Sequence, residues 1–136
     1  MHLRPLIAHP RFLPRVLLLD AAASGATAAL LLAAADLLAL PLHLPADLLR
    51  GAGLALLPFV AAVYALSRRE TPPRGAVAVV VAVNLAWVAA SAWVAFASGL
   101  QPSAAGVAFV LGQAAAVLAF ADLGWIGLRA TRPASA

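Results

Sequence analysis

Long apolar segments occupy most of this chain of 136 residues and leave only short polar connections between them. Hydrophobic residues make up 65% of the sequence and charged residues only 10%. An ordinary soluble domain carries about 25% charged residues, so the charges here are too few to cover a globule in water. This argues against a soluble enzyme, a nucleic-acid-binding domain and a disordered tail. We expect a protein whose surroundings are lipid.

The length of the chain sets the number of membrane crossings. A helix that crosses a bilayer needs about 20 apolar residues, so four helices fit and a fifth would leave almost nothing for the connections. We predict helices over residues 13–40, 48–66, 75–97 and 103–128, with a kink at Pro58. They form a single transmembrane domain with no soluble part. The predicted fold is an all-α, four-helix transmembrane bundle with up-down-up-down topology.

The arginines predict the orientation of the bundle. Cytoplasmic loops of membrane proteins carry an excess of basic residues. Here the basic residues are the following: Arg4, Arg11 and Arg15 in the N-terminal lead, Arg68, Arg69 and Arg74 in the second connection, Arg129 and Arg132 in the tail, and Arg50 alone near the first connection. Both ends are therefore predicted to be cytoplasmic. Asp20 interrupts the first apolar segment, so we expect no cleaved signal peptide.

Polar residues inside the predicted spans are informative, because a central Asp costs about 2.5–3.5 kcal/mol on insertion scales. Helical spacing places several of them on shared faces. They are the following: Asp20, Ser24 and Thr27 on the first span, Asn84, Trp87 and Ser91 on the third, and Gln113 and Asp122 on the fourth. We expect the inner half of the bundle to gather five of the polar side chains, namely Asp20, Ser24, Asn84, Asp122 and Tyr64. Gln113 is expected to lie above them, near the middle of the membrane.

Two interpretations of this cluster stay open. A buried carboxyl such as Asp20 can load and release a proton, so the cluster can be a protonatable or cation-binding cavity. Alternatively, the polar side chains hydrogen-bond across helices and hold the bundle together. The second interpretation is favoured for Asn84, Ser91 and Gln113, whereas Asp20 fits both equally. Asp122 is expected to reach the membrane interface and pair with Arg129.

A second pair of charges is predicted to be structural. Asp36 and Arg50 lie near the facing ends of the first two predicted helices. An ion pair between them accounts for the lone arginine on this side of the bundle.

No motif for catalysis or for a cofactor is present in the sequence. The chain has no Cys, and its three histidines, His2, His9 and His43, lie outside the predicted spans. We therefore expect no metal, no cofactor, no enzymatic activity and no nucleic-acid partner. The expected surroundings are the lipid bilayer, and the protein contact is either a homo-oligomer or a larger membrane-protein partner.

Several different short motifs that combine polar, Gly and Pro residues are distributed along nearly the whole chain. They are the following: Asp20-Ala-x-x-Ser24-Gly25, Leu44-Pro45 with Leu49-Arg50-Gly51-Ala52-Gly53, Leu57-Pro58-Phe59, Asn84-x-x-Trp87-Val88-x-x-Ser91, Phe109-Val110-x-x-Gln113-Ala114, and Phe120-Ala121-Asp122-Leu123 with Gly127-Leu128-Arg129. With these motifs the chain resembles a group of small four-helix integral membrane proteins of proteobacteria that is carried as uncharacterised. The resemblance implies the fold and the topology, and it brings no activity with it.

Two functions follow as hypotheses. The first is a small non-enzymatic protein of the bacterial inner membrane, acting as an accessory or interaction subunit. The alternative is a proton-coupled transporter of a small molecule or cation, acting as a dimer with Asp20 as the coupling carboxylate. The chain is similar to small multidrug resistance transporters in its size, its four spans and the acidic residue in its first span. Their carboxylate is Glu, however, and their glycine-rich third span has no counterpart here.

Overall fold

The computed structural model describes residues 4–131, so His2 and Arg132 lie outside the described residues. Within the described part, helices joined by short connections are the only regular structure, and there is no strand. Its elements are the following: α1 (Arg4–Ile7), α2 (Phe12–Leu42), α3 (Ala46–Ser67), α4 (Arg74–Phe96) and α5 (Ala104–Ala130). The four long helices are long and apolar enough to cross a membrane. The predicted all-α four-helix bundle is confirmed, and the chain has the organisation of a multi-pass membrane protein.

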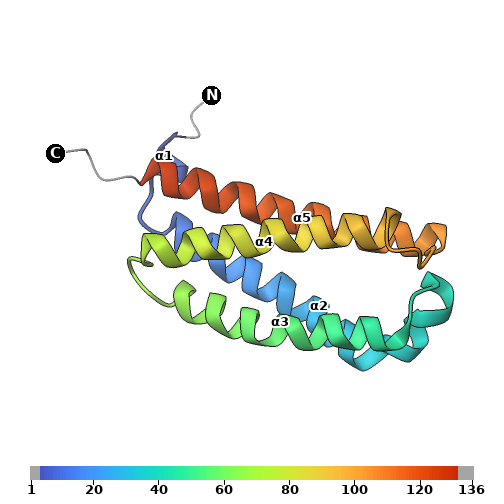
Figure 1. Cartoon of the computed structure of the whole chain (residues 1–136). Helices are drawn as coiled ribbons and strands as arrows, with labels where there is room; N and C mark the ends of the chain where they lie inside the picture. The colour runs from blue at the N-terminus through green and yellow to red at the C-terminus, as the bar shows by residue number, and fades with distance from the viewer. Residues whose placement is uncertain (1–3, 132–136) are drawn as a thin grey trace.

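The long helices alternate in direction (Figure 1). Both chain ends and the α3–α4 connection therefore lie at one end of the bundle, which we call the terminal end. The α2–α3 and α4–α5 connections lie at the other end, the loop end. Seven of the eight arginines within residues 4–131 belong to helix ends and connections of the terminal end, and Arg50 is the exception.

Local sequence explains where the helices end. α2 continues through Pro41 to Leu42, two residues further than predicted, and ends where His43 adopts a left-handed conformation with φ 54°. The amide of Leu44 then donates to the Ala39 carbonyl at 3.1 Å, which closes the helix end. α5 begins at Ala104, directly after the N-cap residue Ser103, whose hydroxyl accepts from the Gly106 amide at 3.0 Å.

The predicted kink at Pro58 has a different counterpart in the structure. α3 runs as one helix from Ala46 to Ser67 with Pro58 inside it. The departure from helical backbone angles lies instead in α2, at Ala34, with φ −120° and ψ 18°. The bend therefore falls on the helix that crosses between its neighbours.

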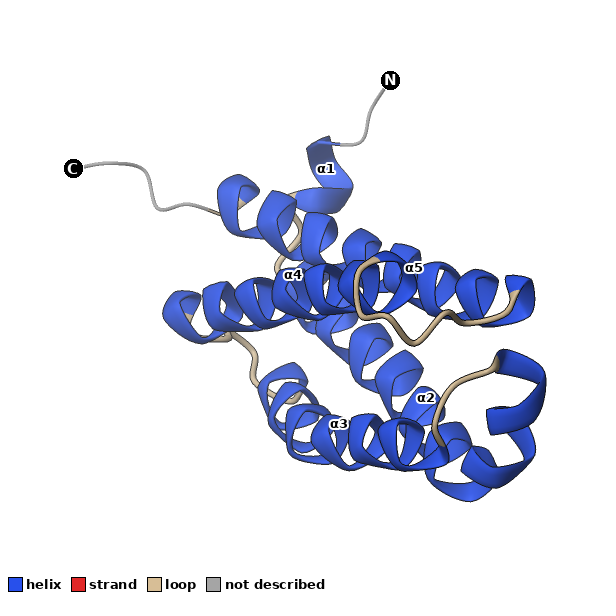
Figure 2. Ribbon diagram, turned by 45° about the vertical axis from the view of Figure 1, so that its right-hand side comes forward, coloured by secondary structure: helices blue, strands red, loops and turns tan. Residues whose placement is uncertain are grey.

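The bundle consists of two hairpins joined along one seam. α2 packs against α3, and α4 packs against α5. The hairpins meet where α2 crosses α5, whereas α3 and α4 hardly touch. Figure 2 shows α3 standing apart from α4, with α2 behind the space between them.

Glycines on α5 allow the close approach along this seam. A Cβ atom built on Gly106 would lie 2.1 Å from the Leu42 carbonyl oxygen, and one on Gly127 would lie 2.5 Å from Leu13 Cδ2. The first contact is with backbone at the loop end, and the second is with a side chain at the terminal end. The crossing of α2 and α5 thus depends on a missing side chain near each end of the seam.

The buried apolar residues form two clusters along the bundle axis. The loop-end cluster includes Leu31, Leu42, Leu49, Leu56 and Val110. The terminal-end cluster is the following: Leu13, Leu17, Ala21, Val63, Val77, Val80 and Leu128. Many large apolar side chains are exposed on the outside, with Leu40 at 86%, as expected for a surface in contact with lipid tails.

We expect Gly106→Ala to destabilise the bundle by about 1–3 kcal/mol, because the added methyl group meets backbone that cannot move alone. Gly112 on the same helix is the matched control, since a Cβ atom there meets nothing within 4 Å. Gly112→Ala should leave stability unchanged or raise it slightly. Unfolding of the purified chain in detergent micelles with increasing SDS, followed by circular dichroism, measures both. Equal effects of the two substitutions would contradict the predicted close approach.

Candidate functional site

The interior of the bundle contains a buried carboxyl group that links the two hairpins. Asp20 of α2 is 2% exposed, and its Oδ1 atom accepts a hydrogen bond from the Ser24 hydroxyl at 3.1 Å. Its Oδ2 atom accepts one from Nδ2 of Asn84 on α4 at 2.8 Å. Ser24 and Asn84 are themselves buried. The structure therefore brings together these three residues of the predicted cluster.

A second group of polar side chains begins one turn after Asn84 along α4 and links α4 to α5. Nε1 of Trp87 donates to Oε1 of Gln113 at 2.8 Å, and Nε2 of Gln113 donates to the Ser91 hydroxyl at 3.0 Å. Nε2 of Gln113 also donates to the Val110 carbonyl at 2.8 Å. The predicted cluster is thus two adjacent networks on α4, one toward α2 and the other toward α5.

The two networks satisfy their own members. Within residues 4–131, every buried side-chain nitrogen or oxygen atom of these helices has a hydrogen-bond partner. A buried polar group without a partner costs free energy in a membrane, so this arrangement stabilises the bundle.

Two cavities lie beside the networks. The first, of about 240 Å³, is lined by α2, α3, α4 and α5 and includes Ser24, Asn84 and Phe59. The second, of about 180 Å³, lies toward the loop end and includes Ser91. Thr27, Trp87 and Gln113 line both, so the Trp87–Gln113 contact separates them. Asp20 is not among the lining residues of either cavity, whereas Ser24 and Asn84, which both bond to its carboxyl group, line the first.

Asp122 does not belong to the cluster, so its predicted position is wrong. It is exposed on α5, whereas Gln113 faces the interior. Nine residues separate the two, and at 3.6 residues per turn this places them about half a turn apart. The predicted pairing with Arg129 is also absent, since the ion pairs within residues 4–131 involve only Arg50. Tyr64, which was expected nearby, is 50% exposed on α3.

The predicted ion pair of Asp36 and Arg50 is present near the loop end. Arg50 also donates to Asp47 Oδ1 at 2.9 Å, so one guanidinium bridges α2 and the start of α3. The two carboxylates are 81% and 97% exposed, and exposed pairs contribute at most about 1 kcal/mol. This ion pair therefore links the two helices of the hairpin and adds little to the stability of the bundle.

Several contacts in the structure were not predicted from the sequence. His43 Nδ1 lies 2.9 Å from the Gln101 carbonyl oxygen, although 58 residues separate them. The Ser103 hydroxyl donates to the Pro41 carbonyl at 2.7 Å, and Nη2 of Arg74 donates to the Leu128 carbonyl at 2.6 Å. The Ser103 position after Pro102 predicts a helix start, but no local pattern indicates a bond to a distant connection.

The described residues contain no cluster of three or more His, Cys, Asp or Glu side chains that could hold a metal ion. Comparison of the chain with protein-family models, with curated proteins and with solved structures gives no match.

We expect Asn84→Leu to destabilise the bundle, because Asp20 loses its partner on α4. The loss should be at least as large as the contribution of one hydrogen bond between membrane helices, which is about 0.6–1.7 kcal/mol. The double variant Asp20→Leu with Asn84→Leu should recover part of this loss, since no buried carboxyl group is left without its partner and only the Ser24 hydroxyl loses one. Thr27→Val is the control, because the Thr27 hydroxyl bonds only to the Ala23 carbonyl of its own helix. Unfolding in SDS measures all three, and an Asn84→Leu variant as stable as the Thr27→Val variant would contradict the assigned role.

Proposed function

We propose that this chain is a non-enzymatic interaction subunit of the bacterial inner membrane that binds the helix of a larger membrane-protein partner through α5. The observation that carries the proposal is Asp122. Its carboxyl group lies on the outer face of a membrane helix, exposed, with no hydrogen bond or ion pair to any residue among 4–131. An acidic group at such a position is costly in lipid and is a sign of a functional contact.

The depth and direction of Asp122 strengthen this argument. It lies eight residues before the end of α5 at Ala130, so about 12 Å along the axis from the terminal end. Side chains on a helix tilt toward its N-terminus, which for α5 is the loop end. The short Asp122 side chain therefore leans toward the middle of the membrane and away from the nearer water. A donor on another molecule would supply the partner that this chain lacks.

The face around Asp122 is suited to close helix packing. Exposed residues repeat at alternating spacings of three and four along α5: Ala105, Ala108, Gly112, Ala115, Ala119, Asp122 and Ile126. We call this row the α5 face. Five of its seven members are Ala or Gly, and small residues let the backbones of membrane helices approach each other closely. A spacing of three and four residues is that of the contact seam between two helices with left-handed crossing.

Charge decides which kind of partner fits the α5 face. In a symmetric dimer within one membrane, the same surface of both copies forms the interface. If the α5 faces pack against each other, each residue lies at the same depth as its counterpart in the second copy. A second copy would therefore set Asp122 against Asp122, and two like charges at one site repel each other. A partner helix with Arg, Lys or a hydrogen-bond donor at the same depth instead neutralises the carboxylate. We therefore assign the face to a different membrane protein.

The arginines support the orientation of the chain in the membrane, and the sequence motifs support its location. The terminal end carries all described arginines except Arg50, and the basic side of a membrane protein faces the cytoplasm. Both chain ends are therefore assigned to the cytoplasmic side. The resemblance to small proteobacterial membrane proteins supports the bacterial inner membrane.

A photo-crosslinking residue in place of Ala115 tests this function in native membranes. We expect a single adduct of defined mass, which disappears in the Asp122→Leu variant and persists in Asp122→Glu. The same crosslinker in place of Ala61 on the exposed surface of α3 is the control and should give lipid adducts only. An adduct of twice the chain mass would show a second copy and overturn the assignment. An adduct that does not depend on Asp122 would overturn it too.

The alternative function, a dimeric proton-coupled transporter, is supported by one observation. Ser24 and Asn84 both bond to Asp20 and both line the cavity of about 240 Å³. A cation in this cavity would contact Ser24 and Asn84, which also bond to the Asp20 carboxyl group. Binding of the cation and protonation of Asp20 would then affect each other.

Binding of tetraphenylphosphonium, a lipid-soluble cation, to the purified chain tests this alternative. If the cavity is a coupled site, Asp20→Asn should abolish binding and the associated release of protons without lowering the amount of folded protein. Asp122→Asn is the control, because this residue lies outside the cavity. Unchanged binding in Asp20→Asn, or loss of the folded protein alone, would remove the case for transport.

A further inference from the structure

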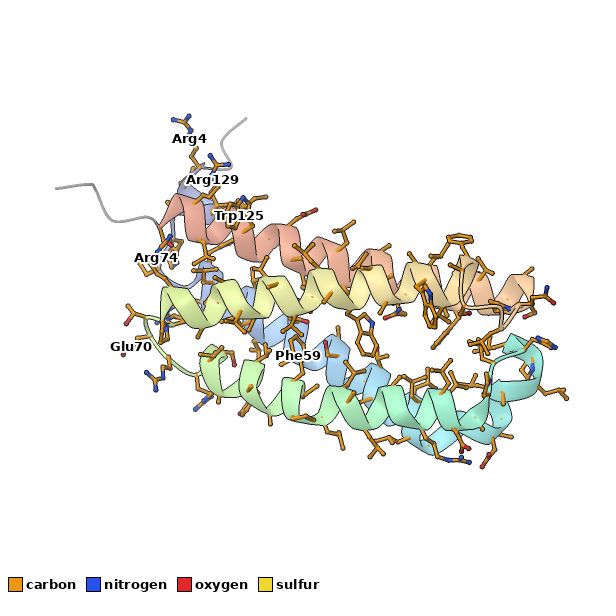
Figure 3. The ribbon with its side chains drawn as sticks, in the orientation of Figure 1. Arg4, Phe59, Glu70, Arg74, Trp125 and Arg129 are labelled. Carbon is orange, nitrogen blue, oxygen red and sulfur yellow. The ribbon has the colours of Figure 1, made fainter. Side chains whose placement is uncertain are left out.

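A groove between α4 and α5 at the terminal end combines positive charge with an aromatic side chain. Its volume is about 760 Å³, and its lining residues are the following: Arg74, Gly75 and Ala78 of α4, and Trp125, Leu128 and Arg129 of α5. Figure 3 shows Arg74, Trp125 and Arg129 at the same end of the bundle, with Arg4 close by. We propose that this groove binds the phosphate headgroup of an anionic phospholipid.

The geometry of Arg74 prepares it for this role. Its Nη2 atom donates to the Leu128 carbonyl at 2.6 Å, and its Nη1 atom lies 3.4 Å from the Thr131 hydroxyl. The last carbonyl groups of a helix lack partners within the helix, so these bonds fix the guanidinium against the end of α5. A guanidinium has five N–H donors, so donors remain for a phosphate oxygen.

The start of α4 adds a second attraction for an anion. The residue before the helix is Pro73, and no side chain caps the first turn. The first amide groups of α4 therefore keep unpaired N–H donors, and the helix dipole adds positive potential there. Gly75 lines the groove without a side chain, so its backbone is accessible to the ligand. A Cβ atom at this position would meet nothing within 4 Å.

The other wall of the groove fits the boundary between headgroup and acyl chains. Trp125 is 53% exposed, and tryptophan prefers the depth of lipid headgroups in membrane proteins. Arg129 is exposed one turn further along α5 and makes no ion pair within residues 4–131. Ala78 and Leu128 supply apolar surface next to the charged groups.

The nearby acidic residues do not occupy the groove. Glu70 belongs to the α3–α4 connection, and Asp122 lies one turn deeper on α5, and neither is among the lining residues. The groove therefore presents two arginines and no carboxylate. Basic pockets between membrane helices on the cytoplasmic side are a recurrent way of holding anionic headgroups. This inference is independent of the partner assigned to the α5 face.

Titration of the full chain in detergent with dioctanoyl phosphatidylglycerol, followed by native mass spectrometry, tests the inference. Dioctanoyl phosphatidylcholine and inorganic phosphate are the comparison ligands. We expect phosphatidylglycerol to bind most tightly, and Arg129→Gln to weaken its binding about fivefold, as the loss of one arginine near a charged membrane surface implies. Gly75→Leu should weaken it as well, because the new side chain fills the groove without changing the charge.

Arg69→Gln is the matched control, because it removes the same charge at the same end of the bundle but outside the groove. It should leave the affinity unchanged, and circular dichroism should show unchanged helix content in all three variants. Equal binding of the two lipids, or an equal loss in Arg69→Gln and Arg129→Gln, would overturn the proposal. Inorganic phosphate that binds as tightly as phosphatidylglycerol would overturn the lipid assignment in favour of a free anion.

Discussion

The hydrogen bond from Asn84 to Asp20 joins the two hairpins in the interior of the bundle. Water does not drive apolar helices together inside a bilayer, so packing and hydrogen bonds between helices must hold them. Apolar clusters lie toward both ends of the bundle, and this bond joins α2 to α4 inside it. Gly106 and Gly127 let α5 approach α2 toward either end of their crossing. The central bond and the two glycines together fix one seam, which leaves α3 free of α4.

The polar residues of the spans divide into two groups with different consequences. Asp20, Asn84 and Gln113 face inward and meet partners within the chain, so their polarity is used in holding the fold. Asp122 and Arg129 face outward, and none of the described residues pairs with them. Because lipid tails offer no hydrogen bonds, the outward group needs other molecules to complete it. Both proposed contacts of this protein therefore lie on its surface, along α5.

The sequence predicts this structure well where a rule acts along one helix. Hydropathy and length predicted the four spans, and a spacing of four residues predicted that Ser24 lies beside Asp20. The rule fails where the rotation of a helix decides the contact. Asp122 was placed with the cluster although Gln113 already fixes the inward side of α5 about half a turn away. The contact of His43 with Gln101 depends on how the hairpins dock, and no local pattern contains that information.

The two sides of α5 connect the surface to the interior. Gln113 on its inner side receives the Trp87 hydrogen bond and separates the two cavities, while Gly112 and Asp122 on its outer side form the α5 face. The Trp87–Gln113 hydrogen bond holds α5 to α4 on the side away from the proposed partner. Since α3 and α4 hardly touch, α5 is held to the rest of the bundle mainly by α4 and by the seam with α2. The inner side of α5 therefore holds the fold together, while its exposed outer side is available to a partner helix.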